Sequence, residues 1–304
     1  MDSRKILEIY KLINDRSPKP VSAWPTIADI PHGVLVLDSD GVVKQKVGGG
    51  LVPVPITLVG SGPISSAPVA SAANLGAMYL ETGDPLWPNG RLYQSRYNGN
   101  MINNGLTAIA DAVKPTRHIV VTSDFAIELQ FYADPANVVA FTGLFSSGRG
   151  NGTLSTDRSF WIERDAMTTT YKVSVYDSAG TSKIISIQNI SNGYWHSIRV
   201  KKVGNLLTAY LNGVQAGTPQ DLTGFVINDA TNSSLFSQLS SRSFQGRVCC
   251  AKLIAETNGF NYDFNQTTGV SISDRSGGAN TGTLTDSTPA SFWSIGWTPI
   301  QWPV

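Results

Sequence analysis

Apolar and polar residues alternate in several short stretches of the chain after residue 118. In residues 125–132 the odd positions carry Phe, Ile, Leu and Phe, and the even positions carry Ala, Glu, Gln and Tyr. A period of two is typical of a strand with one face in a core and the other in solvent. The further members of this series are Tyr171, Val173 and Val175; His196, Ile198 and Val200; Leu207, Ala209 and Leu211; and Val248, Cys250 and Ile254.

Turn-forming residues separate these stretches, and no long helical pattern comes between them. Residues 177–180 (DSAG), 204–205 (GN) and 212–213 (NG) each combine Gly with Asn or Asp. These residue types adopt turn conformations most readily. Many short strands joined by turns predict a mainly β fold, in the form of an antiparallel sandwich.

Residues 3–16 have the pattern of an amphipathic helix instead. Ile6, Ile9, Tyr10 and Ile13 form one apolar stripe, and the prolines at positions 18 and 20 end the helix. A helix this short is marginal alone in water, so the stripe needs a partner surface. Packing on its own domain and anchoring to another copy or another protein are both compatible with the pattern.

The rest of the first third predicts small elements joined by an extended segment. Apolar runs at 33–37 and 42–47 flank the sequence DSDG, which indicates a hairpin. Its aspartates resemble the start of a calcium loop, but the later ligands are missing. Residues 48–73 are rich in Gly and Pro and predict a linker. Residues 74–117 predict a small connecting unit, with a short helix from Leu106 to Val113 that Pro115 ends.

The predicted organisation therefore has four parts. Residues 1–47 form the helix and hairpin for anchoring or oligomerisation, 48–73 the linker, 74–117 the connecting unit, and 118–304 the sandwich with a C-terminal tail.

Composition narrows the range of functions. Charged residues make up 15% of the chain and the formal net charge is +1, so no basic excess is available to neutralise a phosphate backbone. We therefore expect no nucleic-acid partner. No apolar run reaches the length of a membrane-spanning helix, so no membrane insertion is expected. A hydrophobic fraction of 41% is too high for a disordered chain.

The two cysteines and the N-terminus bear on the cellular compartment. Cys249 and Cys250 are adjacent, and neighbouring side chains of a regular strand point to opposite faces, so we expect two reduced, buried strand residues. Glu8 and Lys11 interrupt the segment where a signal peptide would carry its apolar core. We expect a chain that does not use the secretory route.

Two neighbouring segments resemble a known family. The sequence NGYWHSIRV at 192–200, followed by LLTAYLNG at 206–213, resembles the paired strands of laminin-G-like domains of the concanavalin A-like jelly-roll superfamily. Residues 125–132 and 244–254 resemble further strands of that family, and 262–264, 274–277 and 282–284 resemble its closing segment. The resemblance spans residues 120–293 and implies a jelly-roll sandwich. It implies less about function, because the superfamily includes lectins, glycanases and adhesion modules.

The segments before the sandwich resemble the appendages of bacteriophage virions. An anchoring helix, a Gly/Pro linker and the sequence MYLETGDPLWPNG at 78–90 are similar in arrangement to tail fibres and capsid fibre or decoration proteins. The resemblance implies a protein made in the host cytoplasm and exposed on the virion outside the cell. It also implies a homotrimer that contacts other virion proteins through its N-terminal region and attaches to host surface glycans.

Catalytic motifs are incomplete. Glucanases of the superfamily carry Glu-x-Asp-x-x-Glu on one strand, with one carboxylate as nucleophile and one as acid. The nearest match is Glu163 and Asp165, with Thr168 in place of the second Glu. Three histidines in no metal-binding spacing indicate no zinc site. We expect no enzyme and no cofactor, while a glycan-degrading enzyme that uses the sandwich cleft stays an alternative, as does a purely structural capsid or tail component.

Binding is expected at two polar loops. Sugars are held by aromatic faces and by hydrogen bonds from Asn, Asp and Arg, which in sandwiches come from loops at one edge. Calcium binding is implied by the family resemblance alone, with Asp124, Asp263 and Asp274 as available carboxylates and no spacing that selects among them. The candidate ligand-binding residues are Arg149, Asn151, Asp157, Arg158, Trp161, Asn228, Asp229, Asn232 and Arg242.

Overall fold

The chain divides into two compact units. The computed structural model describes residues 35–37, 43–47, 50–53, 58–81, 91–101, 112–134, 143–148, 157–165, 168–229, 233–238, 242–266, 268–285 and 293–299. One unit comprises residues 1–96 and 295–302, and the other comprises residues 97–294 and 303–304. No helix among these described ranges is long and apolar enough to cross a membrane.

The N-terminal unit is built from short strands. Strands β1 (Leu35–Leu37), β2 (Val43–Val47) and β3 (Gly50–Pro53) form a three-stranded antiparallel sheet, in which Leu37 pairs with Val43. The hairpin predicted around the DSDG turn is therefore present as β1 and β2. The predicted helix at 3–16, with Ile6, Ile9, Tyr10 and Ile13, lies outside the described residues.

A second set of strands follows in the same unit. Strand β4 (Leu58–Gly62) pairs in parallel with β5 (Met78–Glu81), and β5 pairs antiparallel with β6 (Arg91–Met101). Two short 3₁₀ turns lie between β4 and β5, at Ile64–Ser66 and Ala72–Asn74. Strand β24 (Trp293–Pro299) also pairs with β6. The segment 48–73, predicted as a linker, thus contains β3 and β4, which are extended chain as a linker would be but are hydrogen-bonded to neighbours.

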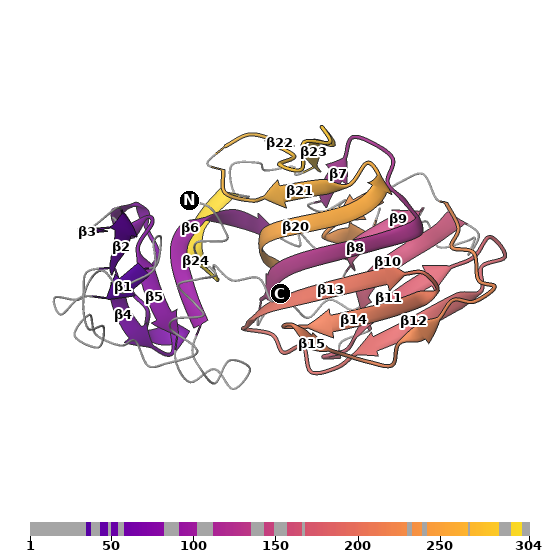
Figure 1. Ribbon diagram of the computed structural model, residues 1–304, viewed down its shortest axis with the longest axis horizontal. Coiled ribbons are helices and arrows are strands. Elements are labelled where there is room, and N and C mark those ends of the chain that lie inside the picture. Colours follow the sequence, from indigo (N-terminus) through magenta and orange to yellow (C-terminus); the bar gives the residue numbers. More distant parts are fainter. Residues whose placement is uncertain are drawn as a thin grey trace. The chain divides into compact units, whose positions relative to one another are not determined.

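The second unit is a sandwich of two sheets. The β8 sheet has the order β15 (Val214–Gln215), β14 (Leu206–Leu211), β13 (Trp195–Val203), β8 (Val120–Ala133) and β20 (Gly246–Thr257). β16 (Gln220–Asp221) pairs with β14, while β21 (Phe260–Asp263) and the last residues of β6 pair with β20. Figure 1 shows β8, β13, β14 and β20 side by side.

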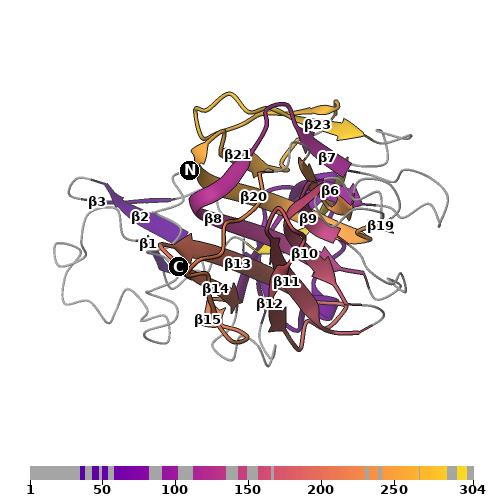
Figure 2. The same ribbon diagram turned by 90° about the vertical axis from the view of Figure 1, so that its right-hand side faces the viewer.

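The β10 sheet is the opposing layer. Its order is β12 (Ser182–Ile187), β11 (Tyr171–Tyr176), β10 (Arg158–Arg164), β9 (Gly143–Gly148), β17 (Ser233–Leu235), β7 (Ala112–Pro115), β23 (Gly282–Thr285) and β22 (Ser271–Ile272). Figure 2 shows β9 to β12 following one another in this order. A two-stranded ribbon, β18 (Ser237–Gln238) and β19 (Arg242–Ser243), lies beyond β17. Val113, expected in a short helix, lies in β7, where it pairs with Leu284.

The core lies between the two sheets. Phe125 of β8 contacts Phe160 of β10 with ring centroids 4.9 Å apart, and Phe131 contacts Tyr171 of β11 at 5.8 Å. The inward-facing residues of β8, β11, β13 and β14 are the apolar members of the predicted alternation. Burial of each such side chain stabilises the fold by about 1.5–3 kcal/mol. The predicted fold class, a mainly β antiparallel jelly-roll sandwich, is confirmed.

Strand β20 departs from the predicted alternation. The register between β20 and β8 shifts between Val248, which pairs with Phe131, and Cys250, which pairs with Gln130. Cys249 is the extra residue of this β-bulge. After it the core positions change from Val248 to Ala251 and Leu253, while Ile254 is 53% exposed. The expectation that Cys250 and Ile254 continue the core-facing series is therefore wrong, because the bulge moves the pattern by one residue.

The start of β20 requires glycine. Gly246 has a φ of +152°, which L side chains rarely adopt. A Cβ atom at this position would lie 2.0 Å from the carbonyl oxygen of Tyr132 and 2.8 Å from the Phe244 ring. The absence of a side chain thus lets β20 approach β8 closely at the point where their pairing begins.

Candidate functional site

A row of residues crosses the outer face of the β10 sheet. On β10 the neighbours Phe160 and Ile162 belong to the core, so Trp161 between them lies on the opposite face. Trp161 pairs across the sheet with Ser146 of β9 and Ser174 of β11. The row continues to Ser234 of β17 at one end and to Ile184 of β12 at the other. Of these residues, only Ile184 is largely exposed, at 41%.

Arg158 is held above this row by aromatic rings. Its guanidinium carbon lies 4.4 Å from the ring centroid of Trp161 and 5.4 Å from that of Tyr176, the last residue of β11. The two rings meet edge to face with centroids 5.6 Å apart. Contact with an aromatic face attracts a cation electrostatically and fixes the plane of the guanidinium group. None of the ion pairs among the described residues includes Arg158.

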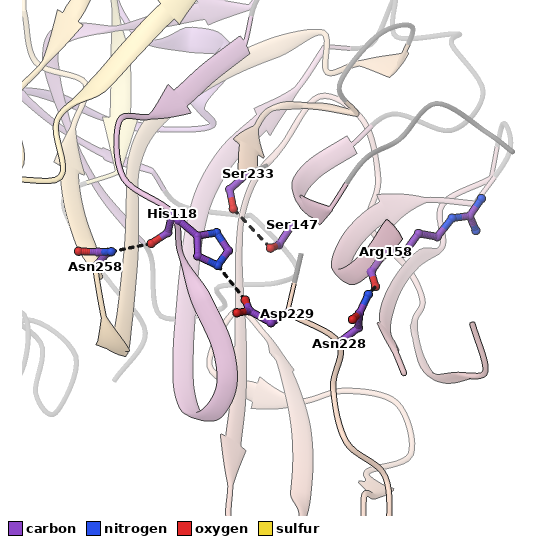
Figure 3. Close-up of polar contacts among 7 residues, drawn as sticks. All are labelled: His118, Ser147, Arg158, Asn228, Asp229, Ser233 and Asn258. Carbon is purple, nitrogen blue, oxygen red and sulfur yellow. Dashed lines mark hydrogen bonds and ion pairs between the residues drawn. The ribbon is translucent and has the colours of Figure 1, made fainter. Parts of the chain in front are cut away.

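The two loops predicted to bind a ligand meet next to this cluster. The side-chain amide of Asn228 donates a hydrogen bond to the carbonyl oxygen of Arg158 at 3.0 Å, and the Asn228 N–H donates to the carbonyl oxygen of Tyr176 at 2.8 Å. The hydroxyl groups of Ser147 and Ser233 lie 3.4 Å apart. Figure 3 shows Asn228 beside the backbone of Arg158 and the Arg158 side chain extending away from it.

Asp229 belongs to a separate contact on the same side of the sandwich. Its carboxylate lies 2.8 Å from Nε2 of His118, which precedes β8 (Figure 3). The His118 carbonyl oxygen accepts a hydrogen bond from the side chain of Asn258 at 2.7 Å. These contacts fix the segment between β7 and β8 to two loops that are distant in the sequence.

Two buried polar groups on the outer face of the β10 sheet lack a hydrogen-bond partner among the described residues. They are the indole N–H of Trp161 and the hydroxyl of Ser234. A buried donor without an acceptor costs about 1–3 kcal/mol. Because Trp161 is 3% exposed and Ser234 is fully buried, neither group is accessible to a ligand in this structure.

The structure thus brings together some of the predicted ligand-binding residues and separates others. Arg158, Trp161 and Asn228 form one cluster, whereas Asp229 pairs with His118. Asp157 is half-buried directly before β10. Arg149, Asn151 and Asn232 lie outside the described residues, and for Arg242 only the strand β19 is described.

Tyr176 and His118 were not among the predicted residues. The signal for Tyr176 was available, since the alternation that places Val173 and Val175 in the core places Tyr176 on the outer face with Ser174. No local signal identifies His118, because its partner Asp229 is 111 positions away in the sequence.

The carboxylates considered for catalysis do not lie along one strand. Strand β10 ends at Arg164, and the Asp165 N–H donates a hydrogen bond to the carbonyl oxygen of Thr170 in the connection to β11. Asp165 also forms an ion pair with Lys172 at 2.9 Å. Glu163 remains on the strand. The Glu-x-Asp-x-x-Glu arrangement of superfamily glucanases, with all three carboxylates on one strand, is not reproduced at these residues.

The carboxylates considered for calcium each contact protein donors. Asp124 accepts a hydrogen bond from the Gly204 N–H at 2.8 Å, and Asp263 pairs with Arg275 at 2.7 Å. Asp274 accepts several hydrogen bonds from its own turn and from β21. Among the described residues, no group of three His, Cys, Asp or Glu side chains is placed to hold a metal ion.

Asp274 organises the turn after β22. It accepts hydrogen bonds from the Asn261 and Ser276 N–H groups at 2.8 Å, from the Ser276 hydroxyl at 2.8 Å and from the Asn280 N–H at 3.0 Å. Burial on its own raises the pKa of Asp274, but the hydrogen bonds from Ser276, Asn280 and Asn261 outweigh it and hold this pKa below its usual range. The carboxylate therefore has a structural role in joining β21 to the closing segment.

No protein-family model and no curated protein matches the chain. Similar solved structures include a putative carbohydrate-binding protein from Bacteroides ovatus, at 12% identity and a TM-score of 0.44, covering 76% of this chain and 71% of that one. Domains LG4-5 of the mouse laminin α1 chain match at 13% identity and a TM-score of 0.40, with 64% and 47% coverage. A SAP-like pentraxin from Limulus polyphemus matches at 13% identity and 0.38, with 52% and 75% coverage.

Proposed function

We propose that the sandwich is a carbohydrate-binding module without catalytic activity, and that its ligand binds at the Arg158 cluster on the outer face of the β10 sheet. The observation that carries the proposal is the position of Arg158, which is stacked on Trp161 and Tyr176 and is in none of the ion pairs among the described residues. The laminin-G-like sequence motifs in 192–213 support a lectin-like role through the family resemblance.

The chemistry of the cluster suits a ligand rich in hydroxyl groups. A guanidinium group presents five N–H donors in one plane, and stacking on a ring uses its face and leaves its edge available. The exposed side chain of Ile184 supplies an apolar surface for the C–H face of a sugar ring.

A glycan array followed by titration of the strongest binder tests this proposal. Arg158→Ala should weaken binding about 10-fold or more, because hydrogen bonds from a charged donor contribute about 1.5–3 kcal/mol. Arg199→Ala is the matched control, since Arg199 lies on the other sheet in an ion pair with Glu128 at 2.9 Å. An equal loss in both variants would contradict the assignment of the site.

Two further experiments distinguish the alternative functions. Release of reducing ends from host polysaccharide, abolished by Glu163→Gln, would show a glycan-degrading enzyme. An array without any binder, together with unchanged host adsorption of particles that lack the protein, would show a purely structural component. Either result would overturn the proposed function.

The location of the protein is the subject of a second proposal. We propose that the chain is part of a bacteriophage virion appendage, anchored through its N-terminal region, with the sandwich displayed outside the host cell. The N-terminal amphipathic pattern and the Gly/Pro-rich segment support this. Deleting residues 1–50 should release the protein from particles while the sandwich stays folded. Unchanged incorporation of the deleted chain would contradict anchoring.

Oligomeric state is tested with the full chain. The resemblance to phage fibres predicts a homotrimer, and the stripe formed by Ile6, Ile9, Tyr10 and Ile13 is the expected contact. Mass photometry should therefore give three times the chain mass of 32.6 kDa. Replacing Ile6 and Ile13 by Ser should shift the distribution to the single chain, and a stable monomer of the unaltered protein would contradict the trimer.

A further inference from the structure

The two cysteines of the chain are in contact with each other. The Sγ atoms of Cys249 and Cys250 lie 3.3 Å apart, and neither forms a disulfide. Both thiols also contact the side-chain oxygen of Gln130, at 3.0 Å and 3.3 Å respectively. Cys249 is 1% exposed and Cys250 is 8% exposed.

The β-bulge explains why adjacent thiols meet. In a regular strand the side chains of residues 249 and 250 would point to opposite faces and could not touch. At the bulge, two residues of β20 lie opposite the single residue Gln130 of β8. Both side chains are therefore directed toward the same group on the neighbouring strand.

We propose that Cys249 and Cys250 form a redox site, at which a hydroperoxide converts the two thiols into a disulfide between adjacent residues. The site lies on β20 and β8, whereas the Arg158 cluster lies on the β10 sheet, so the proposal does not depend on glycan binding. The short distance between the sulfurs is the observation that carries it.

The reaction balances with hydrogen peroxide as the oxidant. One thiolate attacks a peroxide oxygen, the O–O bond breaks, and a sulfenic acid and hydroxide form. The neighbouring sulfur then attacks the sulfenic sulfur, the S–S bond forms, and the hydroxyl group leaves as water after taking up a proton. Overall two thiols lose two electrons and two protons, and one peroxide becomes two molecules of water.

Proximity sets the expected course of this oxidation. A sulfur 3.3 Å away is in a position to capture the sulfenic acid before a second peroxide reaches it. Peroxide is close to water in size, so the small exposure of Cys250 gives it more access than a larger disulfide reagent would have. The Cα atoms of adjacent residues are closer than those of most disulfides, so the ring is strained and should be readily reduced.

The test uses the native full chain, which holds only these two cysteines. The protein is treated with hydrogen peroxide, the peroxide is removed, and the chain is unfolded in an alkylating reagent and weighed by mass spectrometry. We expect both thiols to disappear together, with a mass loss of two hydrogen atoms on a single chain, and dithiothreitol to restore both. A peptide containing residues 249 and 250 should carry the whole change.

Cys249→Ser and Cys250→Ser are the matched controls, since each keeps one thiol that cannot close the ring. Each should gain oxygen atoms or form dimers, with no loss of hydrogen within one chain. The proposal is overturned if the unaltered protein gains oxygen atoms without a disulfide or links only between chains. It is also overturned if both thiols survive a peroxide dose that closes the disulfide in the unfolded chain. These outcomes concern the unaltered protein, so they hold even if a serine variant does not fold.

Discussion

Two glycines of this sandwich differ in how much a side chain at their position would cost. Gly246 combines a positive φ with close contact to the Tyr132 carbonyl oxygen, whereas Gly224 has a φ of +73° and open space for 4 Å around the position that a Cβ atom would take. The two glycines therefore separate the cost of a collision from the cost of conformation. Both costs arise at single residues and neither is visible in the hydrophobic pattern.

Gly246→Ala should lower the free energy of unfolding by about 3 kcal/mol or more, because strain from φ adds to a forced shift of β20 away from β8. Gly224→Ala should lower it by only about 1–2 kcal/mol, the cost of the left-handed conformation alone. Urea unfolding followed by tryptophan fluorescence measures both values. Equal losses in the two variants would show that the contact with Tyr132 is relieved without cost.

Asp274 gives a prediction that depends on pH. Asp274→Asn should destabilise the protein by about 2–3 kcal/mol at neutral pH, because hydrogen bonds to a charged acceptor are lost or weakened. The pKa of Asp274 is lowered in the folded state. Its contribution is therefore fully present above the unfolded-state pKa, about 3.9, and is lost as pH falls through the lower folded-state value.

The measurement is the difference in unfolding free energy between the unaltered protein and Asp274→Asn, at neutral and at acidic pH. The difference should shrink in acid. Asp221 is the control, since its pKa is also lowered by hydrogen bonds from Thr223, but it is exposed and these bonds come from one neighbouring residue. Asp221→Asn should have the smaller effect, and a difference for Asp274→Asn that is constant with pH would contradict its assigned role.

At the scale of elements, the strands show what a sequence pattern determines. Strands β8, β11, β13 and β14 were predictable because most of their core-facing positions are apolar. The position of strand β20 was predictable, but which of its residues face the core was not. The bulge at Cys249 depends on pairing with β8 and not on the residue preferences of the segment itself. Arg158, Trp161 and Asn228 were predicted as binding residues from loop composition, but the stacking of Arg158 and Trp161 with Tyr176 depends on the register of β10 and β11.

Strand β8 provides a direct test of the alternation. Phe131→Ala should destabilise the protein by about 3–5 kcal/mol, because Phe131 is fully buried against Tyr171 and Phe244 and its removal leaves a cavity. Lys201→Ala on the adjacent strand β13 should change stability by less than about 0.5 kcal/mol, as expected for an outward-facing residue. Thermal unfolding of both variants measures these changes in stability. Similar losses of stability in the two variants would contradict the faces assigned to Phe131 and Lys201.

At the scale of the whole molecule, the sandwich has a complete core of its own. Among the described residues, all members of the main buried cluster lie between 113 and 293, within the unit formed mainly by residues 97–294. A unit with its own core is expected to fold alone. The low charge, 15% of residues with a net charge of +1, gives the chain little net charge for long-range electrostatic attraction.

A fragment of residues 97–304 should therefore unfold in one cooperative transition and keep the near-ultraviolet circular dichroism of its buried aromatic residues. Phe131→Ala in the fragment should lower the transition as it does in the full chain. A fragment that is soluble but lacks a cooperative transition would show that the N-terminal unit is needed for the sandwich to fold.

The bulge in β20 also determines where this strand tolerates a change of length. Val248 and Ala251 both face the core although three positions separate them, so the strand holds one residue more than a regular ladder requires. Removing Cys249 would leave both halves of β20 in register with β8. Removing Lys252 would shift the residues after it by one position, so the apolar side chains of that half of β20 would face solvent. Cys249 is thus a place where β20 can lose a residue and keep its core, and soluble yield of the two deletions would show the difference.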